Sequence, residues 1–213
     1  PDWSRGLGDV YKRQAIGFGS REILNKAAIM NGIDGGELIS PTLTFEAINQ
    51  FASKTMKTNV VRVPMTKEIG IDLKTTGQMV NSKTNMVYLC NPNNPTGVIM
   101  NPKELEVFCK ETSKKSIVFV DEAYHEYVMD KQYRSMVSLV NEGYDVLISR
   151  TASKVHGLAG LRVGYAISTP KIIKRLNSYM NGSLNVVGLR GAIASYKDKR
   201  LSLIHISEPT RPI

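Results

Sequence analysis

The sequence predicts an α/β fold, a mostly parallel β-sheet that carries helices on both faces. The first observation behind this prediction is a set of short runs that are apolar throughout, at residues 86–90, 117–120, 146–148 and 163–167, with a largely apolar, β-branched run at 60–63. Strands without a polar face are typical of parallel sheets that are covered on both sides. The second observation is that amphipathic segments stand between the runs, as alternating strands and helices require.

Each remaining element has its own local signal. A further short strand is expected at residues 36–40. Helices are expected over residues 20–30, 46–54, 73–80 and 102–112. The last of these begins with Pro102, because proline suits the first turn of a helix. In such sheets ligands bind beyond the carboxyl ends of the strands, so the residues after Cys90, Val120 and Ile148 are the candidates for a site.

Composition argues against several functional classes. The formal net charge is +9, but the lysines are scattered and no basic run is interleaved with aromatic residues, so no nucleic-acid partner is expected. No apolar run approaches the ~20 residues that a membrane span needs. Cys90 and Cys109 lack the paired spacing of a disulfide framework or a zinc site, and both are expected to be buried, reduced thiols. A cytoplasmic location is expected, with an export signal ahead of the given residues left open.

The two ends of the chain are related to each other. Residues 9–14 correspond to the DNA string GATGTGTATAAGAGACAG, and residues 201–206 correspond to its reverse complement. Complementary ends of this kind are typical of translated sequencing-library adapters. Residues 1–14 and 201–213 are therefore expected to be non-native tails and are excluded from the fold. Residues 15–200 are then expected to be a fragment of a longer gene product.

Polar residues follow two of the expected strands. After Cys90 comes the run Asn-Pro-Asn-Asn-Pro-Thr-Gly, in which the prolines and glycine make a rigid turn and Asn94 projects an amide donor. After Val120 comes Asp121, a carboxylate that faces the ligand crevice, with the phenol of Tyr124 three residues on. Taken alone, the first motif could be only a tight loop, and Asp121 could be only a helix cap.

A lysine follows the third of these strands. After Ile148 come Thr151, Ser153 and Lys154, and Arg162 stands eight positions beyond the lysine. A lysine in a ligand crevice can lose its hydration and attack a carbonyl carbon, as a Schiff base requires. Hydroxyl groups, backbone N–H groups and an arginine are the partners that a phosphate ester needs.

In this order, Asn-Pro-Thr-Gly, Asp-x-x-Tyr and Ser-Lys-x-x-Gly-Leu-x-Gly-x-Arg resemble the motifs of class I/II aminotransferases, enzymes of fold type I that use pyridoxal 5'-phosphate (PLP). With Gly-Ser-Arg-Glu at residues 19–22, they are similar to the histidinol-phosphate aminotransferase branch. The resemblance covers residues 15–200, roughly half of a full family member. It implies part of the large, PLP-binding domain of such a transferase, in which the strand at residues 163–167 runs antiparallel to the others.

The resemblance also implies a role for each motif residue. Lys154 would hold PLP covalently and carry the proton transfer, with Asp121 paired to the pyridinium nitrogen. Asn94 and Tyr124 would bind the phenolate oxygen of the ring, and Tyr124 joins Lys154 and Asp121 in the expected catalytic set. Phe45 would stack on the ring, with a core phenylalanine at a helix start as the alternative. The phosphate would be bound by Ser20, Arg21, Thr151, Ser153 and Arg162.

The implied function is an aminotransferase. It would exchange an amino group between an amino acid, or an amino-alcohol phosphate such as histidinol phosphate, and a 2-oxo acid. His156 stands where the family usually has Phe or Tyr, and Ala152 replaces a larger residue, which weakens the expectation of histidinol phosphate as substrate. A PLP-dependent decarboxylase or acyl-transferring synthase on the same fold, and an inactive gene fragment, stay open as alternatives. The full-length protein would be a homodimer with small-molecule substrates and no metal, and the fragment alone would have little activity.

Overall fold

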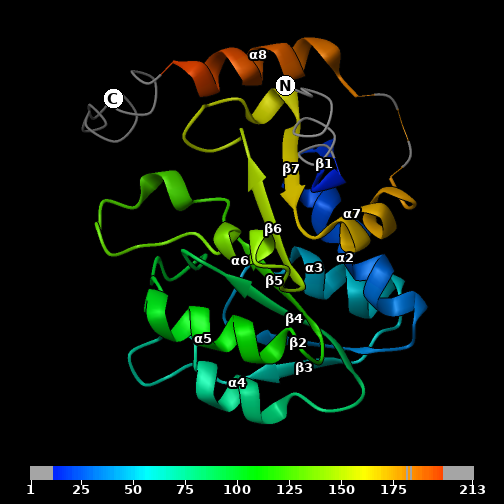
Figure 1. The fold of residues 1–213 in the computed structure, drawn as a ribbon, viewed down its shortest axis with the longest axis vertical. Coiled ribbons are helices and arrows are strands. Elements are labelled where there is room, and N and C mark those ends of the chain that lie inside the picture. Colours follow the sequence, from blue (N-terminus) through cyan, green and yellow to red (C-terminus); the bar gives the residue numbers. More distant parts are fainter. Residues whose placement is uncertain (1–11, 181, 183, 199–213) are drawn as a thin grey trace.

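A computed structural model describes residues 12–180, 182 and 184–198 of the chain (Figure 1). Within these residues, seven strands form one sheet in the order β1-β7-β6-β5-β4-β2-β3. The strands are β1 (Gln14–Phe18), β2 (Glu37–Pro41), β3 (Val60–Val63), β4 (Thr84–Cys90), β5 (Ile117–Asp121), β6 (Val146–Thr151) and β7 (Val163–Ile167). Strands β2 to β6 run parallel, whereas β7 is antiparallel to both of its neighbours, β6 and β1. The mostly parallel sheet and the antiparallel strand at residues 163–167 are therefore confirmed.

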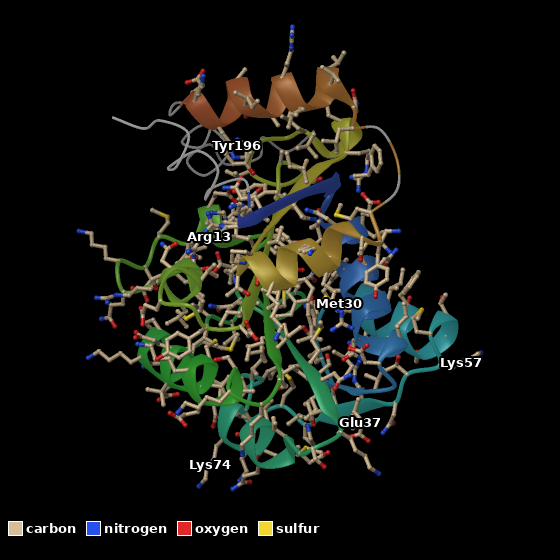
Figure 2. All side chains as sticks on the ribbon, turned by 45° about the vertical axis from the view of Figure 1, so that its right-hand side comes forward. Arg13, Met30, Glu37, Lys57, Lys74 and Tyr196 are labelled. Carbon is tan, nitrogen blue, oxygen red and sulfur yellow. The ribbon has the colours of Figure 1, made fainter. Side chains whose placement is uncertain are left out.

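Helices cover both faces of the sheet (Figure 1). They are α2 (Ser20–Ile33), α3 (Ala47–Gln50), α4 (Leu73–Met79), α5 (Pro102–Thr112), α6 (Val137–Asn141), α7 (Pro170–Asn177) and α8 (Val186–Lys197). Helices α2, α3 and α7 pack on one face, α4, α5 and α6 pack on the other, and α8 lies beside β7 at one end of the molecule. Met30 of α2 is buried, while Lys74 of α4 is exposed at the surface (Figure 2). The layers predicted for an α/β fold are confirmed.

Successive residues of a strand enter opposite halves of the core, because strand side chains alternate between the two faces. Tyr88 and Phe119 belong to the half beneath α2 and α7, and their ring centroids lie 5.6 Å apart in an edge-to-face contact. Val87, Val118 and Val120 belong to the half beneath α5 and α6. All five side chains are fully buried. The continuous apolar runs in the sequence are thus the signature of strands that have helices on each side.

Side-chain caps fix where two of the helices begin. The Asp72 carboxylate accepts a hydrogen bond of 2.9 Å from the backbone N–H of Thr75 at the start of α4. At the start of α5, the Asn101 side chain accepts one of 3.0 Å from the backbone N–H of Lys103, next to the predicted Pro102. Each cap satisfies an N–H group that has no partner inside its own helix.

Some predicted boundaries are wrong or incomplete. The helix expected over residues 46–54 is α3 followed by a π-helical turn, η1 (Phe51–Thr55). The sequence also missed β1, α6, α7 and α8, and two short 3-10 turns, η2 (His125–Tyr127) and η3 (Ala159–Leu161). Strand β1 includes Gln14, which was assigned to the adapter-derived tail. Residues 1–11 and 201–213 lie outside the described residues, so their origin stays a prediction.

Both cysteines are buried free thiols, as expected. Burial raises the pKa of the Cys90 thiol and raises the pKa of the Cys109 thiol to about 12, which keeps both in the unreactive thiol form. Among the helices of the described residues, none has the length and apolar character needed to cross a bilayer.

Candidate active site

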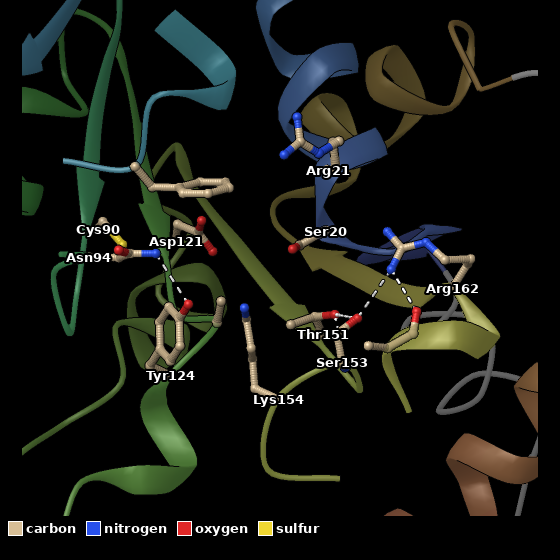
Figure 3. Close-up of a pocket in the computed structure, with 13 residues that line it drawn as sticks. Ser20, Arg21, Cys90, Asn94, Asp121, Tyr124, Thr151, Ser153, Lys154 and Arg162 are labelled. Carbon is tan, nitrogen blue, oxygen red and sulfur yellow. Dashed lines mark hydrogen bonds between the residues drawn. The ribbon is translucent and has the colours of Figure 1, made fainter. Parts of the chain in front are cut away.

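The expected site residues come together in one pocket, at the carboxyl ends of β4, β5 and β6 (Figure 3). The predicted residues that line this pocket are Ser20, Arg21, Phe45, Asn94, Asp121, Tyr124, Thr151, Ser153, Lys154 and Arg162. Cys90, Ala123 and Ala159 also line it and were not predicted. Segments far apart in the sequence meet here because parallel strands bring their carboxyl ends to one edge of the sheet.

Asp121 is the last residue of β5, and its side chain is buried at the base of the pocket. The Ser149 hydroxyl donates a hydrogen bond of 2.7 Å to Oδ1 of Asp121, and the Tyr88 hydroxyl donates one of 3.2 Å to Oδ2. The strand register explains the first contact, because Asp121 lies opposite Ser149 on β6. Tyr88 stands two residues before Cys90, which lies opposite Asp121 on β4, so the Tyr88 side chain is on the same face of the sheet as Asp121. Burial raises the pKa of Asp121 even though both hydrogen bonds act in the opposite direction.

Lys154 is half-buried and lies beside a pair of polar side chains from two other segments. Its Nζ lies 4.8 Å from the ring centroid of Tyr124, a distance at which a cation is attracted to the face of an aromatic ring. The Asn94 side-chain amide donates a hydrogen bond of 3.2 Å to the Tyr124 hydroxyl. An amine, a phenol and an amide thus gather near the buried carboxyl group of Asp121 (Figure 3).

A group of hydrogen-bond donors lies on the other side of the pocket (Figure 3). The Thr151 hydroxyl donates to Oγ of Ser153 at 2.9 Å, and the backbone N–H of Ser153 donates to Oγ1 of Thr151 at 3.1 Å. Arg162 donates to Oγ of Ser153 at 3.5 Å and to the carbonyl oxygens of Ala159 and Phe18 at 2.8 and 3.3 Å. Hydroxyl groups and a guanidinium in this arrangement suit an anion such as phosphate.

Two glycines bring the N-terminus of α2 against these donors. Gly19 has a φ of +77°, and a Cβ added there would lie 2.3 Å from Nη2 of Arg162. A Cβ added at Gly164 of β7 would lie 2.3 Å from the backbone nitrogen of Ser20. A Cβ at Gly164 would collide with backbone atoms, and one at Gly19 would displace the Arg162 guanidinium and require an unfavourable φ, so glycine permits this close approach. The first turn of α2 receives no side-chain cap, and the free N–H groups of a helix N-terminus attract anions.

Phe45 is half-buried at the rim of the pocket and packs against the core beneath α2. The guanidinium carbon of Arg21 lies 5.9 Å from the centroid of its ring. The two readings of Phe45, a stacking partner for a coenzyme ring and a core side chain, are both compatible with this place. Its stacking role stays a prediction.

The sequence did not single out Tyr88 and Ser149, the two residues that donate hydrogen bonds to Asp121. A signal was present, because each carries a hydroxyl group inside an apolar strand segment. Buried hydroxyls are hydrogen-bonded in native proteins, so a partner on a neighbouring strand had to exist. Finding that partner required the register of the strands.

The two histidines among the described residues lie near the site without lining it. Nδ1 of His125 lies 2.9 Å from the carbonyl oxygen of Glu122. Nδ1 of His156 lies 2.8 Å from Oγ of Ser195 in α8, and this side chain is buried. The departure from the family pattern at His156 therefore affects packing behind the pocket.

The model of the family Aminotransferase class I and II matches residues 12–202, and the chain belongs to this family. It is 36% identical over 195 residues to a histidinol-phosphate aminotransferase of Moorella thermoacetica, covering 91% of this chain and 50% of that protein. It is 36% identical over 184 residues to one of Brevibacillus brevis, covering 84% of this chain and 50% of that protein.

The fold is also similar to that of a solved structure. A histidinol-phosphate aminotransferase from Sinorhizobium meliloti, crystallised in complex with pyridoxal-5'-phosphate, superposes with a TM-score of 0.84 at 24% identity. The match covers 95% of this chain and 55% of that one. The chain thus spans about half the length of the relatives that it matches.

Proposed function

We propose that this chain is the coenzyme-binding part of a PLP-dependent aminotransferase. The enzyme moves an amino group between an amino acid, or an amino-alcohol phosphate such as histidinol phosphate, and a 2-oxo acid. The observation that carries the proposal is the convergence of Lys154, Asp121 and the donors around Arg162 in one pocket. An amine nucleophile, a buried carboxyl group and an anion cradle are what PLP requires of a protein.

The chemistry of the pocket residues fits PLP. The donors around Arg162 and the uncapped N-terminus of α2 suit the phosphate, since both attract anions. The Asp121 carboxyl group, across the pocket, suits the pyridinium nitrogen at the far end of the coenzyme. When bound, PLP would supply an electron sink for the carbanion formed at the substrate's α-carbon.

The protein's own side chains then have distinct tasks. Asp121 would hold a proton at the ring nitrogen, kept in place by the hydrogen bonds from Ser149 and Tyr88. Asn94 and Tyr124, already hydrogen-bonded to each other, would orient the ring through its phenolate oxygen. Nζ of Lys154 would move a proton at the substrate's α-carbon as a general base and acid.

Amino transfer is favoured over decarboxylation or acyl transfer on the same fold. The fold alone does not decide between these reactions. The family that matches the chain and the curated relatives described above are all aminotransferases. The side chains that this chemistry needs are all present in the pocket, which argues against an inactive product of the gene.

We extend the proposal to a cytoplasmic homodimer. The two buried free thiols, Cys90 and Cys109, support a reducing compartment. Helix α8 exposes 61% of Val186 and 76% of Val187, and clustered apolar side chains of this kind are usually covered by another protomer or domain.

Product analysis tests the proposed reaction. The full-length protein that contains this chain is supplied with PLP, 2-oxoglutarate and one amino donor at a time: histidinol phosphate, L-phenylalanine or L-aspartate. Amino transfer predicts the oxo product of the donor together with glutamate, and no carbon dioxide. Lys154→Ala should abolish both products. Release of carbon dioxide without glutamate would favour the decarboxylase, and the absence of every product would favour the inactive fragment.

A further inference from the structure

A buried polar cluster lies behind the Lys154 segment and outside the coenzyme pocket. Glu126 lies in the turn η2, two residues after Tyr124, and His156 lies two residues after Lys154. The ring of His156 contacts Tyr196 of α8, which is labelled in Figure 2 on the side of that helix nearest the sheet. The cluster therefore joins three segments that are far apart in the sequence.

The contacts within this cluster are close and specific. Oε1 of Glu126 lies 3.5 Å from Nε2 of His156, and these side chains are 16% and 6% exposed. On the other edge of the imidazole, Nδ1 lies 2.8 Å from Oγ of Ser195. The ring centroids of His156 and Tyr196 lie 4.0 Å apart. Together these contacts hold the imidazole in one orientation, with Nε2 close to the Glu126 carboxyl group but without a hydrogen bond between the two.

The charge of Glu126 is poorly compensated. Both of its carboxylate oxygens are buried and accept no hydrogen bond from the described residues, and burial raises the pKa of Glu126 to about 7. Nδ1 of His125 lies 3.2 Å from Oε2, but burial lowers the pKa of His125 to about 4, so this imidazole is neutral near pH 7. Arg150 is already paired with Glu122 at 2.8 Å. His156 is therefore the group to which a proton of Glu126 can pass.

We propose that Glu126 and His156 share one proton and thereby hold the Lys154 segment against the Tyr124 turn, so that both are positioning residues for the lysine. The assignment of a task to Lys154 rests on the proposed function, whereas the pair itself does not. Each partner stands two residues from a side chain of the site, so a change in their contact is transmitted through a short stretch of backbone. Neither partner touches the pocket itself, within the described residues.

Proton sharing makes the contact depend on pH in both directions. With one proton between the partners, it can pass from the Glu126 carboxyl to Nε2 of His156 and leave a carboxylate beside an imidazolium. A second proton neutralises the carboxylate, and removal of the last proton leaves a carboxylate beside a neutral imidazole. Either change removes the attraction between opposite charges. The contact is therefore strongest in the middle of the pH range.

Other ionisable groups among the described residues surround the pair. They are Glu122, His125, Tyr127, Tyr133, Arg150, Tyr165 and Tyr196. Burial raises the pKa of three of the phenols, those of Tyr127, Tyr133 and Tyr196, so these keep their protons at neutral pH. Burial lowers the pKa of His125, which places its titration well on the acid side of neutrality.

Hydrogen exchange of the chain without PLP tests the proposal. The measured quantity is the protection factor of the backbone amides in residues 152–162 between pH 5 and pH 9. We expect protection to be highest near pH 7 and to fall about tenfold toward each end, because the attraction between opposite charges is lost there. Glu126→Gln and His156→Phe should each flatten this profile. Glu111→Gln, at an exposed carboxylate of α5, should leave it unchanged.

A further variant separates proton sharing from simple attachment of α8. Ser195→Ala removes the hydroxyl that holds Nδ1 of His156, so the amides of α8 should lose protection while residues 152–162 keep their pH profile. A profile without a maximum in the parent chain would overturn the proposal, as would a maximum retained in Glu126→Gln or His156→Phe. If one of these variants does not fold, the other decides. Borohydride trapping of PLP at Lys154 tests the proposed function separately, and it should still succeed in both variants.

Discussion

Ser149 and Asp121 face each other across adjacent parallel strands, and the serine hydroxyl donates a hydrogen bond of 2.7 Å to Oδ1 of the carboxyl group. A second donor, Tyr88, reaches the other carboxyl oxygen from β4. Both contacts come from rigid strands, so the carboxyl group is held in one orientation. Burial disfavours the charged form of Asp121, whereas these hydrogen bonds favour it. A cation such as a ring N–H⁺ placed at this carboxyl group would further stabilise its charged form.

Ser149→Ala should destabilise the chain without PLP by about 1–3 kcal/mol, because it leaves a buried acceptor short of a hydrogen bond. The loss of stability should grow as the pH rises from 5 to 8, since the removed hydrogen bond stabilised the carboxylate form of Asp121. Urea unfolding at each pH measures this. Ser168→Ala is the matched control, because that buried hydroxyl donates to the carbonyl oxygen of Val146 and its loss should not depend on pH. Equal pH dependence in the two variants would contradict the account.

Asp121→Asn should change the pH dependence of stability in a defined direction. A carboxyl group whose pKa is raised by folding keeps its proton in the folded chain at a pH where the unfolded chain, with a pKa of about 4, has lost it. The folded chain then binds more protons, so stability falls as the pH rises through this window. Asparagine does not titrate, so relative to the parent chain the variant should become more stable with rising pH. If the difference in unfolding free energy between the variant and the parent chain is constant between pH 4 and pH 8, burial does not perturb the pKa of Asp121.

The same variant should bind PLP and yet transfer amino groups slowly. A neutral amide cannot hold the proton at the ring nitrogen, and the loss of a charged hydrogen bond worth about 3 kcal/mol predicts a reduction of roughly 100-fold. The rate of a single turnover, followed by the absorbance of the coenzyme, measures this. Near-parent rates for Asp121→Asn would mean that Asp121 serves only as a structural residue at the end of β5.

Gly19→Ala should weaken PLP binding more than it weakens the fold. The residue has a φ of +77°, and its added methyl group would displace the Arg162 guanidinium. Gly35→Ala is the matched control, with a φ of +70° and nothing within 4 Å of the added Cβ. Both should lose about 1–3 kcal/mol of stability, because a residue with a side chain rarely adopts a positive φ, and only Gly19→Ala should lose affinity for PLP, by at least about tenfold. Titration of each variant with PLP, alongside urea unfolding, separates the two effects.

The sequence predicted the layers of this fold because buried parallel strands need apolar residues on both faces, as residues 86–90 of β4 and 117–120 of β5 have. It predicted the pocket residues because the carboxyl ends of such strands define where polar side chains matter. Helix α7 was missed although Thr169 and Pro170 mark its start, since its eight residues hold only a short apolar stripe. Strand β1 was missed because it begins at Gln14, in a segment set aside as a tail.

Contacts between strands could not be predicted in the same way. Tyr88 and Ser149 were readable as buried polar residues, but their common partner depends on which residues of β4, β5 and β6 lie opposite one another. The Glu126–His156 contact likewise depends on how η2, the Lys154 segment and α8 pack together. Single-sequence patterns carry periodicity and local turn signals, and they do not carry register or packing.

The central claim is that Lys154 is the residue that holds PLP, and covalent trapping tests it most directly. The chain is incubated with PLP, reduced with borohydride, digested and examined by mass spectrometry. We predict one dominant pyridoxyl-labelled peptide, with the label on Lys154, and its disappearance in Lys154→Ala. Lys174→Ala, at a lysine of α7 that lies outside the pocket lining, is the matched control and should leave the label in place. A label on a different lysine, or equal labelling of Lys154→Ala, would contradict the account.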